Sequence, residues 1–319
     1  MAVSHWTNTV LDRAKRRLGR QGAGARCPLC DGPSSRELFV ASDRYPVRYC
    51  PTCDGAFVHP MPTDAELADF YSDDRYHGGG HEGFGYTDYL AEGDRHRQSL
   101  LAHDPRLDAL EGLLPGRGRL LDVGCGTGYR LSVAQDRGWQ AVGVEPSSWA
   151  VEIGSERYGV ELHCGMLQDQ GFADGSFQAV MLEDGIEHVT RPVELLAEVV
   201  RVLAPDGVIV VSVPNFGSRR ARTRGADWNE VRPPEHLTYL SLGSLRALAA
   251  RCGLEVVFAS RHPRFQVMAE DLDGTLPGPM RRAVGKLPEA VQPVAREAVI
   301  RAYDATLQYP KLFALLRRA

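Results

Sequence analysis

Three glycines, Gly124, Gly126 and Gly128, follow an apolar run that contains one acid, Asp122. This order is typical of a buried strand that ends in a tight turn and leads into a helix. Glycine is needed where the backbone takes unusual dihedral angles or approaches a ligand closely. A second acid, Glu145, ends the next apolar run, and an acid about 20 residues beyond a glycine turn is well placed for ribose hydroxyls. The glycine turn and the second acid together therefore predict a site for a nucleotide-type ligand rather than an ordinary strand-to-helix turn.

Four of the seven cysteines form two close pairs, Cys27 with Cys30 and Cys50 with Cys53. Nineteen residues separate the pairs, which is within the range of four-cysteine zinc sites. We expect a reducing compartment, where such a pattern indicates metal rather than disulfides. Closed four-thiolate sites are structural, and in a small segment the metal supplies much of the folding energy. The cysteines therefore predict a structural Zn²⁺ without a catalytic role.

Two glutamate–histidine pairs, Glu187-His188 and Glu235-His236, occur in the second half of the chain. Histidine has an unperturbed pKa near 6.5, which suits it to accept a proton at neutral pH. Either histidine could instead hydrogen-bond its own loop. We predict His236 as the base or as a ligand of the reacting group, with Glu235 orienting it or sharing its work, and His188 as the other candidate.

Strands alternate with helices between residues 119 and 258, which predicts a parallel sheet with helices on both faces. Ligands of such sheets bind beyond the carboxyl ends of the strands, where the glycine turn and Glu145 fall. The expected strands are 119–123, 140–145, 160–164, 177–182, 208–213 and 254–258, with a further one at 265–269, and the expected helices between them are 130–137, 147–158 and 193–203.

The composition is that of an ordinary globular protein of 319 residues, with 43% hydrophobic and 24% charged residues. A net charge of −4 argues against a general nucleic-acid binder, which is usually basic. No apolar run approaches the roughly 20 residues of a membrane span, and a signal-peptide core is absent. We expect a cytoplasmic monomer or homodimer that acts on a small molecule, with no nucleic-acid or membrane partner.

The run from Asp122 to Gly128, together with Glu145, resembles the first signature of class I S-adenosylmethionine-dependent methyltransferases. A dinucleotide-binding Rossmann domain is the alternative, but its fingerprint is Gly-x-Gly-x-x-Gly, and the third glycine here comes one residue earlier. The Glu-His pair after the fourth strand also matches, whereas Gln178 stands where the family usually has an acid. The resemblance implies an α/β fold with a doubly wound, Rossmann-like seven-stranded sheet, and S-adenosylmethionine as cofactor, with S-adenosylhomocysteine as product.

The resemblance also implies roles for individual residues. Asp122 matches the residue that holds the methionine end of the cofactor, and Glu145 matches the one that binds the ribose. Many members carry an acid after the third strand for the adenine amino group, but this chain has Met166 and Leu167 there, which suggests apolar contact with the base. Tyrosines N-terminal to the turn close over the cofactor in the resembling enzymes. The predicted cofactor-binding residues are Asp122, Gly124, Gly126, Gly128, Glu145, Met166, Leu167, Glu183, Tyr76 and Tyr86.

The N-terminal part resembles one bacterial branch of the family, which methylates nucleotide-linked sugars and other small metabolites. That branch combines a zinc ribbon with a Pro-x-Pro, here Pro60-Met61-Pro62, and with a Glu-His pair that faces the methyl acceptor. Four arginines between Arg219 and Arg224 would suit a phosphate or diphosphate group. The predicted organisation is a basic helical arm (1–25), the zinc ribbon (26–60), a helical and aromatic lid (61–114), the S-adenosylmethionine-binding domain (115–270) with a substrate loop (214–240), and a helical C-terminal element (271–319).

The predicted function is methyl transfer to a small molecule, either a sugar or a specialised metabolite of natural product biosynthesis, by O- or C-methylation with a histidine base. O-methylation of an aromatic or polyketide-like product is the alternative acceptor chemistry. Two other classes stay open: an RNA methyltransferase that grips nucleic acid with its ribbon, and a binding module without catalysis. The acidic charge and the lack of an Asn-Pro-Pro-Tyr motif argue against the first. The intact Asp122, glycines and Glu145 argue against the second.

Overall fold

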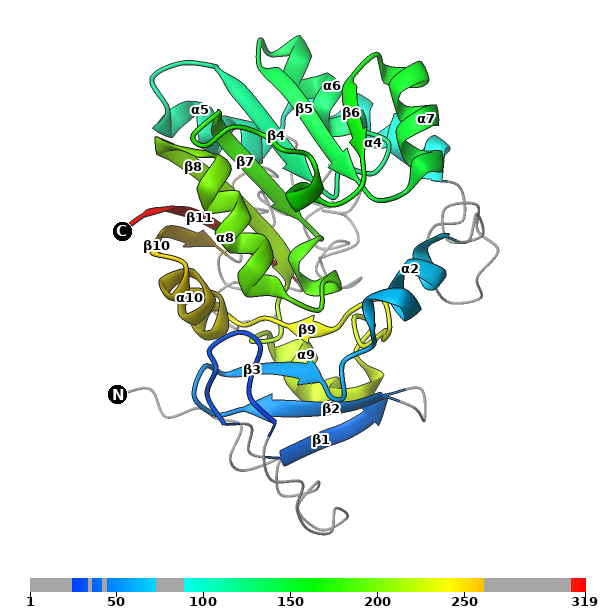
Figure 1. Cartoon of the computed structure of the whole chain (residues 1–319), viewed down its shortest axis with the longest axis vertical. Coiled ribbons are helices and arrows are strands. Elements are labelled where there is room, and N and C mark those ends of the chain that lie inside the picture. Colours follow the sequence, from blue (N-terminus) through cyan, green and yellow to red (C-terminus); the bar gives the residue numbers. More distant parts are fainter. Residues whose placement is uncertain (1–24, 34–35, 42–44, 73–88, 261–310) are drawn as a thin grey trace, which may run out of the picture.

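The computed structural model describes residues 25–33, 36–41, 45–72, 89–260 and 311–319 (Figure 1). Their strands form a seven-stranded sheet in the order β10-β11-β8-β7-β4-β5-β6 and a four-stranded sheet in the order β1-β2-β3-β9. None of the described helices is both long and apolar enough to cross a membrane. The basic arm through residue 24, Tyr76, Tyr86 and the expected strand at 265–269 lie outside the described residues.

The large sheet confirms the predicted α/β fold. Five strands run parallel, and their carboxyl ends therefore meet at one edge. These strands are β4 (Arg119–Val123), β5 (Gln140–Glu145), β6 (Glu161–Cys164), β7 (Phe177–Glu183) and β8 (Leu203–Pro214). The two remaining strands are β10 (Leu254–Ser260) and β11 (Lys311–Arg318), and β11 lies antiparallel between β8 and β10.

The prediction of a helical C-terminal element is wrong for its last residues, because Lys311–Arg318 form strand β11. Residues 312–316 are all buried, and a short continuous apolar run does not distinguish a buried strand from a buried helix by periodicity. Alternate side chains enter different cores: Leu312 lies in one, and Phe313 lies in the other. This alternation is the geometry of a strand covered on both faces.

Helices cover both faces of the sheet (Figure 1). Neighbouring residues of β4 therefore pack in different cores. Leu120 packs with residues of α4, α5 and α6, whereas Leu121 packs with residues of α8 and α10. The helices are α4 (Tyr89–Ala102), α5 (Pro105–Leu113), α6 (Tyr129–Asp136), α8 (Pro192–Val202) and α10 (Leu242–Arg251), with α7 (Ser148–Tyr158) beside the edge strand β6. Short helical turns follow strand ends at η2 (Leu167–Asp169) and η3 (Ile186–His188).

The small sheet joins the N-terminal segment to a distant loop. Its first three strands are β1 (Arg36–Ala41), β2 (Tyr45–Cys50) and β3 (Gly55–Val58), and the fourth is β9 (Thr238–Tyr239). Phe57 of β3 pairs with Thr238 of β9, and Figure 1 shows β9 lying between the blue N-terminal strands and the large sheet. Phe57 also packs in a core shared with the large sheet. The N-terminal segment is therefore built onto the loop that carries His236.

Candidate active site and metal centre

The glycine turn connects β4 to α6 at the carboxyl edge of the large sheet. The Gly124 N–H donates to the Val144 carbonyl at 2.8 Å, which fixes the turn against the end of β5. Gly128 caps α6 with a φ of +73°, and a Cβ at this position would lie 2.8 Å from Val160 Cγ2. A side chain there would be strained both in its backbone and in its packing, which explains the third glycine.

Glu145 meets the turn as its sequence spacing predicted. Its buried carboxylate accepts a hydrogen bond from the Gly126 N–H at 2.9 Å and another from the Ser147 N–H at 3.0 Å. Burial raises the pKa of Glu145, and the two amide hydrogen bonds oppose that rise. The two N–H donors hold the acid at the turn and favour its ionised form.

Asp122 lies on β4, directly before the turn, and is buried at 4% exposure. Burial raises its pKa to about 7, and the neighbouring Arg130 guanidinium opposes this rise. Its strand neighbours are Gly143 on β5 and Met181 on β7. A carboxyl group with a pKa this close to neutrality is common at functional sites.

Glu183, at the end of β7, is held by two arginines. The Arg130 Nε lies 2.9 Å from one Glu183 oxygen, and Arg106 donates to the other. Arg130 also pairs with the buried Asp104 at 3.0 Å. Glu183 was predicted to bind the cofactor, and in the structure its carboxylate is part of this ion network. Sequence reasoning missed Arg106, Arg130 and Asp104, because they stand within helical patterns and match no motif.

The two apolar residues expected to contact the adenine base differ in environment. Leu167 is 1% exposed and packs in the core. Met166 follows the end of β6 by two residues and is 39% exposed. Met166 alone of this pair presents its side chain at the carboxyl edge. The arginines of α9 (Arg219–Arg224) also differ in environment. Arg222 pairs with Asp54 at 3.3 Å, whereas Arg219 and Arg220 are exposed.

The two candidate bases, His188 and His236, lie together, with ring centroids 4.7 Å apart. His188 ends η3, and His236 precedes β9. The Leu237 N–H donates to the Glu187 carbonyl at 2.8 Å, and the Val58 N–H donates to the Leu237 carbonyl at 2.9 Å. The histidine loop, which is the segment between β8 and β9 that carries His236, is therefore hydrogen-bonded to η3 on one side and to β3 on the other.

Both imidazoles are neutral in this environment. Burial lowers the pKa of His188 to about 4 and that of His236 well below its usual range. His236 Nδ1 donates to the Glu230 carbonyl at 2.8 Å, which leaves Nε2 with its lone pair. Glu235 was predicted to orient His236, but this orienting contact comes from the backbone of Glu230. The carboxylate of Glu235 lies 3.4 Å from Arg232.

Sequence reasoning did not assign a role to Glu187, which the structure places beside both histidines. Its ligand oxygen and one nitrogen of each ring all lie within 4.8 Å of one another. Glu187 is 1% exposed, and burial raises its pKa well above the usual range. The signal in the sequence was its position directly before His188.

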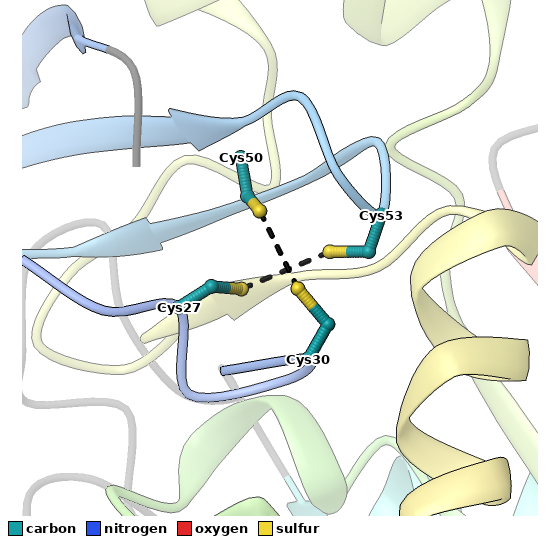
Figure 2. A group of neighbouring side chains, drawn as sticks. All are labelled: Cys27, Cys30, Cys50 and Cys53. Atoms are coloured by element: carbon teal, nitrogen blue, oxygen red, sulfur yellow. Dashed lines mark hydrogen bonds between the residues drawn. The ribbon is translucent and has the colours of Figure 1, made fainter. Parts of the chain in front are cut away.

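The four cysteines of the N-terminal segment converge on one point (Figure 2). Cys27 Sγ lies 3.7 Å from Cys53 Sγ, and Cys30 Sγ lies 3.5 Å from Cys50 Sγ. Four sulfurs in a tetrahedron about 2.3 Å from a zinc ion lie about 3.8 Å apart, so the spacing fits this metal. All four thiols are free, and four thiolates this close together would repel one another. A cation would therefore be needed to keep four thiolates together.

A family model described as "Methyltransferase domain" matches residues 94–258, which include the glycine turn, both histidines and Glu187 but not the four cysteines. A "Demethylmenaquinone methyltransferase" of Renibacterium salmoninarum is 35% identical over 138 residues, 42% of this chain and 56% of the relative. A "Ubiquinone biosynthesis O-methyltransferase" of a Bradyrhizobium species is 27% identical over 186 residues, 52% of this chain and 70% of the relative. The chain spans about half the length of the first curated relatives it matches.

A solved structure supports the fold. The "Crystal structure of a SAM dependent methyltransferase from Archaeoglobus fulgidus" superposes with a TM-score of 0.50 at 19% identity, and the match covers 72% of this chain and 99% of that one. At this identity the likeness shows the α/β fold alone.

Proposed function

This chain belongs to the methyltransferase-domain family, and we propose that it transfers the methyl group of S-adenosylmethionine to a small-molecule acceptor, a sugar or a specialised metabolite. The observation that carries the proposal is the contact between Glu145 and Gly126 at the carboxyl edge of the sheet. An acid that is fixed by the glycine turn can bind ribose hydroxyls there. Asp122 would hold the methionine end, and Met166 would contact the base.

Bound S-adenosylmethionine would supply an electrophilic methyl group on a sulfonium. Methyl transfer is an in-line displacement, so the protein mainly positions the acceptor and excludes water. The acceptor side of this site is the loop between β8 and β9, which carries His236. Because Nδ1 of His236 donates to Glu230, its Nε2 can accept a proton from a hydroxyl or an acidic carbon. His188 lies against this ring and is the second candidate for the same role.

A second acceptor class is favoured by the relatives. The curated relatives include enzymes named for quinone methylation, so a ring carbon or ring hydroxyl is the competing acceptor. Arg219 and Arg220, which are exposed on α9 in the same segment between β8 and β9 as His236, instead favour a phosphorylated or diphosphate-linked acceptor. The choice between O- and C-methylation follows from which of these acceptors is correct.

Calorimetry with S-adenosylmethionine tests the donor, and incubation with two acceptor pools tests the acceptor. We expect binding of the cofactor and transfer of labelled methyl to nucleotide-sugars, with no transfer to quinone precursors. Transfer to the quinone precursors alone would establish the second acceptor class. Absence of cofactor binding would overturn the methyltransferase proposal and leave a binding module that retains the fold.

We also propose that Cys27, Cys30, Cys50 and Cys53 bind a structural Zn²⁺. The proposal rests on the sulfur spacing and on the burial of three of the four thiols, at 1%, 0% and 4% exposure for Cys27, Cys50 and Cys53. The metal would hold β2 and β3 in place, and β3 pairs with β9. Zinc would thereby support the loop of His236 without taking part in the reaction.

A further inference from the structure

We propose that Glu187, His188 and His236 form a second metal site, which binds a divalent transition-metal cation beside the methyl acceptor. The three residues by themselves indicate cation binding, whereas the role of the ion in methyl transfer rests on the proposed function. The site is distinct from the four cysteines, since it contains nitrogen and oxygen ligands and belongs to the family domain.

The three ligand atoms come from two segments that are fixed to each other. Glu187 and His188 lie on η3, and His236 comes from the loop before β9. The hydrogen bond from the Leu237 N–H to the Glu187 carbonyl joins the two segments directly. The three ligand atoms lie within 4.8 Å of one another, whereas two atoms at coordination distances of about 2.0–2.2 Å from one ion lie at most about 4.4 Å apart, so binding an ion would draw these side chains slightly closer together.

In each imidazole, one ring nitrogen hydrogen-bonds the backbone, so the second nitrogen is the one that would bind the metal. His236 Nδ1 donates to the Glu230 carbonyl at 2.8 Å, and His188 hydrogen-bonds the backbone of Glu235. A histidine that ligates a metal typically donates its other N–H to a carbonyl or carboxylate, which fixes the tautomer and the ring orientation. The backbone of residues 230–235 performs this task for both rings.

Glu187 supplies independent evidence for a ligand. It is 1% exposed, and within the described part of the chain neither of its carboxylate oxygens has a hydrogen-bond partner. A buried carboxylate without a partner is strongly destabilising, unless it is paired, bound to a metal or protonated. If each imidazole turns its unprotonated nitrogen toward the cluster, neither ring has an N–H there that could donate a hydrogen bond to the Glu187 carboxylate. A cation would remove this penalty.

Charges of both signs surround the cluster. The carboxylates of Asp184 and Glu230 act on Glu187, whereas the cations Arg232 and Lys311 act on both histidines. Lys311 pairs with Asp184. Arg232 Nη2 lies 3.5 Å from His236 Nε2 and would have to turn toward the carboxylates of Glu230 and Glu235, at 3.8 and 3.4 Å.

Two imidazoles and one carboxylate suit Zn²⁺, Fe²⁺, Co²⁺ or Mn²⁺ and leave coordination positions open. With an ion bound, His188 and His236 would use their lone pairs as ligands, so neither ring would act as the base. An acceptor hydroxyl bound to the ion would instead lose its proton to water, because the ion lowers the pKa of the hydroxyl. Its oxygen would then form a bond to the methyl carbon. The carbon–sulfur bond would break, and its electron pair would stay on the sulfur of S-adenosylhomocysteine.

The test uses the full chain with zinc in its cysteine site and adds Co²⁺. We expect one further equivalent to bind and to give a visible cobalt spectrum without a sulfur charge-transfer band. Glu187→Gln and His236→Asn should each weaken this binding at least about 10-fold. His163→Ala is the matched control, because His163 contacts Glu161 at 2.9 Å on the exposed edge strand, and it should leave cobalt binding unchanged.

Failure of Co²⁺ to bind the zinc-loaded protein would overturn the metal site, as would unchanged binding in Glu187→Gln. A Glu187→Gln protein that melts at a higher temperature and binds no less cobalt would show that a proton neutralises Glu187. Retained zinc and an unchanged circular dichroism spectrum verify that each variant is folded, and His188→Asn replaces any that is not. Calorimetry with S-adenosylmethionine on the same samples separates the two proposals, since loss of cobalt binding with intact cofactor binding concerns the second site alone.

Discussion

Glu145 links the glycine turn to the proposed ribose site through the amides of Gly126 and Ser147. Each of these contacts joins an N–H to an ionised carboxylate, so each is stronger than a neutral hydrogen bond. The same carboxylate is the predicted partner of the cofactor hydroxyls. At this position the turn and the proposed ribose binding depend on one side chain.

We expect Glu145→Ala to weaken binding of S-adenosylmethionine about 10- to 100-fold, because it removes a charged acceptor worth about 1.5–3 kcal/mol. Isothermal calorimetry measures the change. Glu161→Ala, on the neighbouring edge strand β6 and exposed, is the control that should bind normally. Equal affinities for both variants would place the ribose elsewhere.

Asp122 offers a pH-dependent prediction. With a pKa of about 7 in the fold and about 3.9 when unfolded, the folded state holds more protons between these values. The free energy of unfolding therefore falls as pH rises through this window. We expect Asp122→Asn to be more stable than the parent chain by on the order of 2–4 kcal/mol at pH 8, and by roughly half as much at pH 5.5. Urea unfolding at the two pH values measures this.

The same Asp122→Asn variant should bind S-adenosylmethionine more weakly, because the methionine end loses its charged partner. A stabilised protein with reduced affinity is the signature of a strained functional site. A variant that is less stable at pH 8 would mean that the Arg130 charge outweighs the burial of Asp122.

At the scale of elements, β9 connects the N-terminal segment to the loop that carries His236. Two residues of β9 pair with β3, and Val58 donates to the Leu237 carbonyl directly after His236. The proposed zinc lies at the opposite end of β2 and β3, where Cys50 ends β2 and Cys53 lies in the turn before β3.

Cys50→Ser should abolish the zinc site, since a structural metal site contributes its binding energy to folding. We expect faster hydrogen–deuterium exchange in peptides that cover residues 225–241, because the Val58–Leu237 contact is released. Peptides that cover β4 and α6 should exchange as before, and cofactor binding should persist. Unchanged exchange at residues 225–241 would show that the loop is ordered without the metal. Cys164→Ser, at an exposed cysteine outside the cluster, is the control.

At the scale of the whole molecule, the C-terminal strand joins β10 to the rest of the large sheet. Strand β11 pairs with β8 and β10, and Phe313 is fully buried with its ring 6.2 Å from that of Phe258. The first residue of the strand, Lys311, reaches Asp184 at the carboxyl edge. The end of the chain therefore contributes both to the core and to the edge where the site lies.

Phe313→Ala should destabilise the protein by about 3–5 kcal/mol, because it removes a large buried ring from a packed core. Val257→Ala, on β10 and 44% exposed, should cost less than about 1 kcal/mol. Thermal unfolding of both variants gives the comparison. A small loss for Phe313→Ala would mean that β11 is not an integral strand of the sheet.

The sequence by itself determined the features that local patterns encode. The alternation of strands and helices, the glycine turn with its acid and the paired cysteines can be read within short windows, because backbone geometry and ligand chemistry restrict which residues fit. The expected strand at 119–123 and that at 140–145 agree with β4 and β5 to the residue. The acid at 145 reaches the turn because parallel neighbouring strands end at one edge.

Only the tertiary structure decided which distant residues meet. Glu187 lies beside His236 although 48 residues separate them, Arg106 reaches Glu183, and residues 311–318 enter the sheet between two strands that precede them. Such pairings depend on how the sheet orders its strands and on which surfaces pack together. Local secondary-structure propensity does not encode these pairings, so only the folded chain identifies the residues that complete the candidate site.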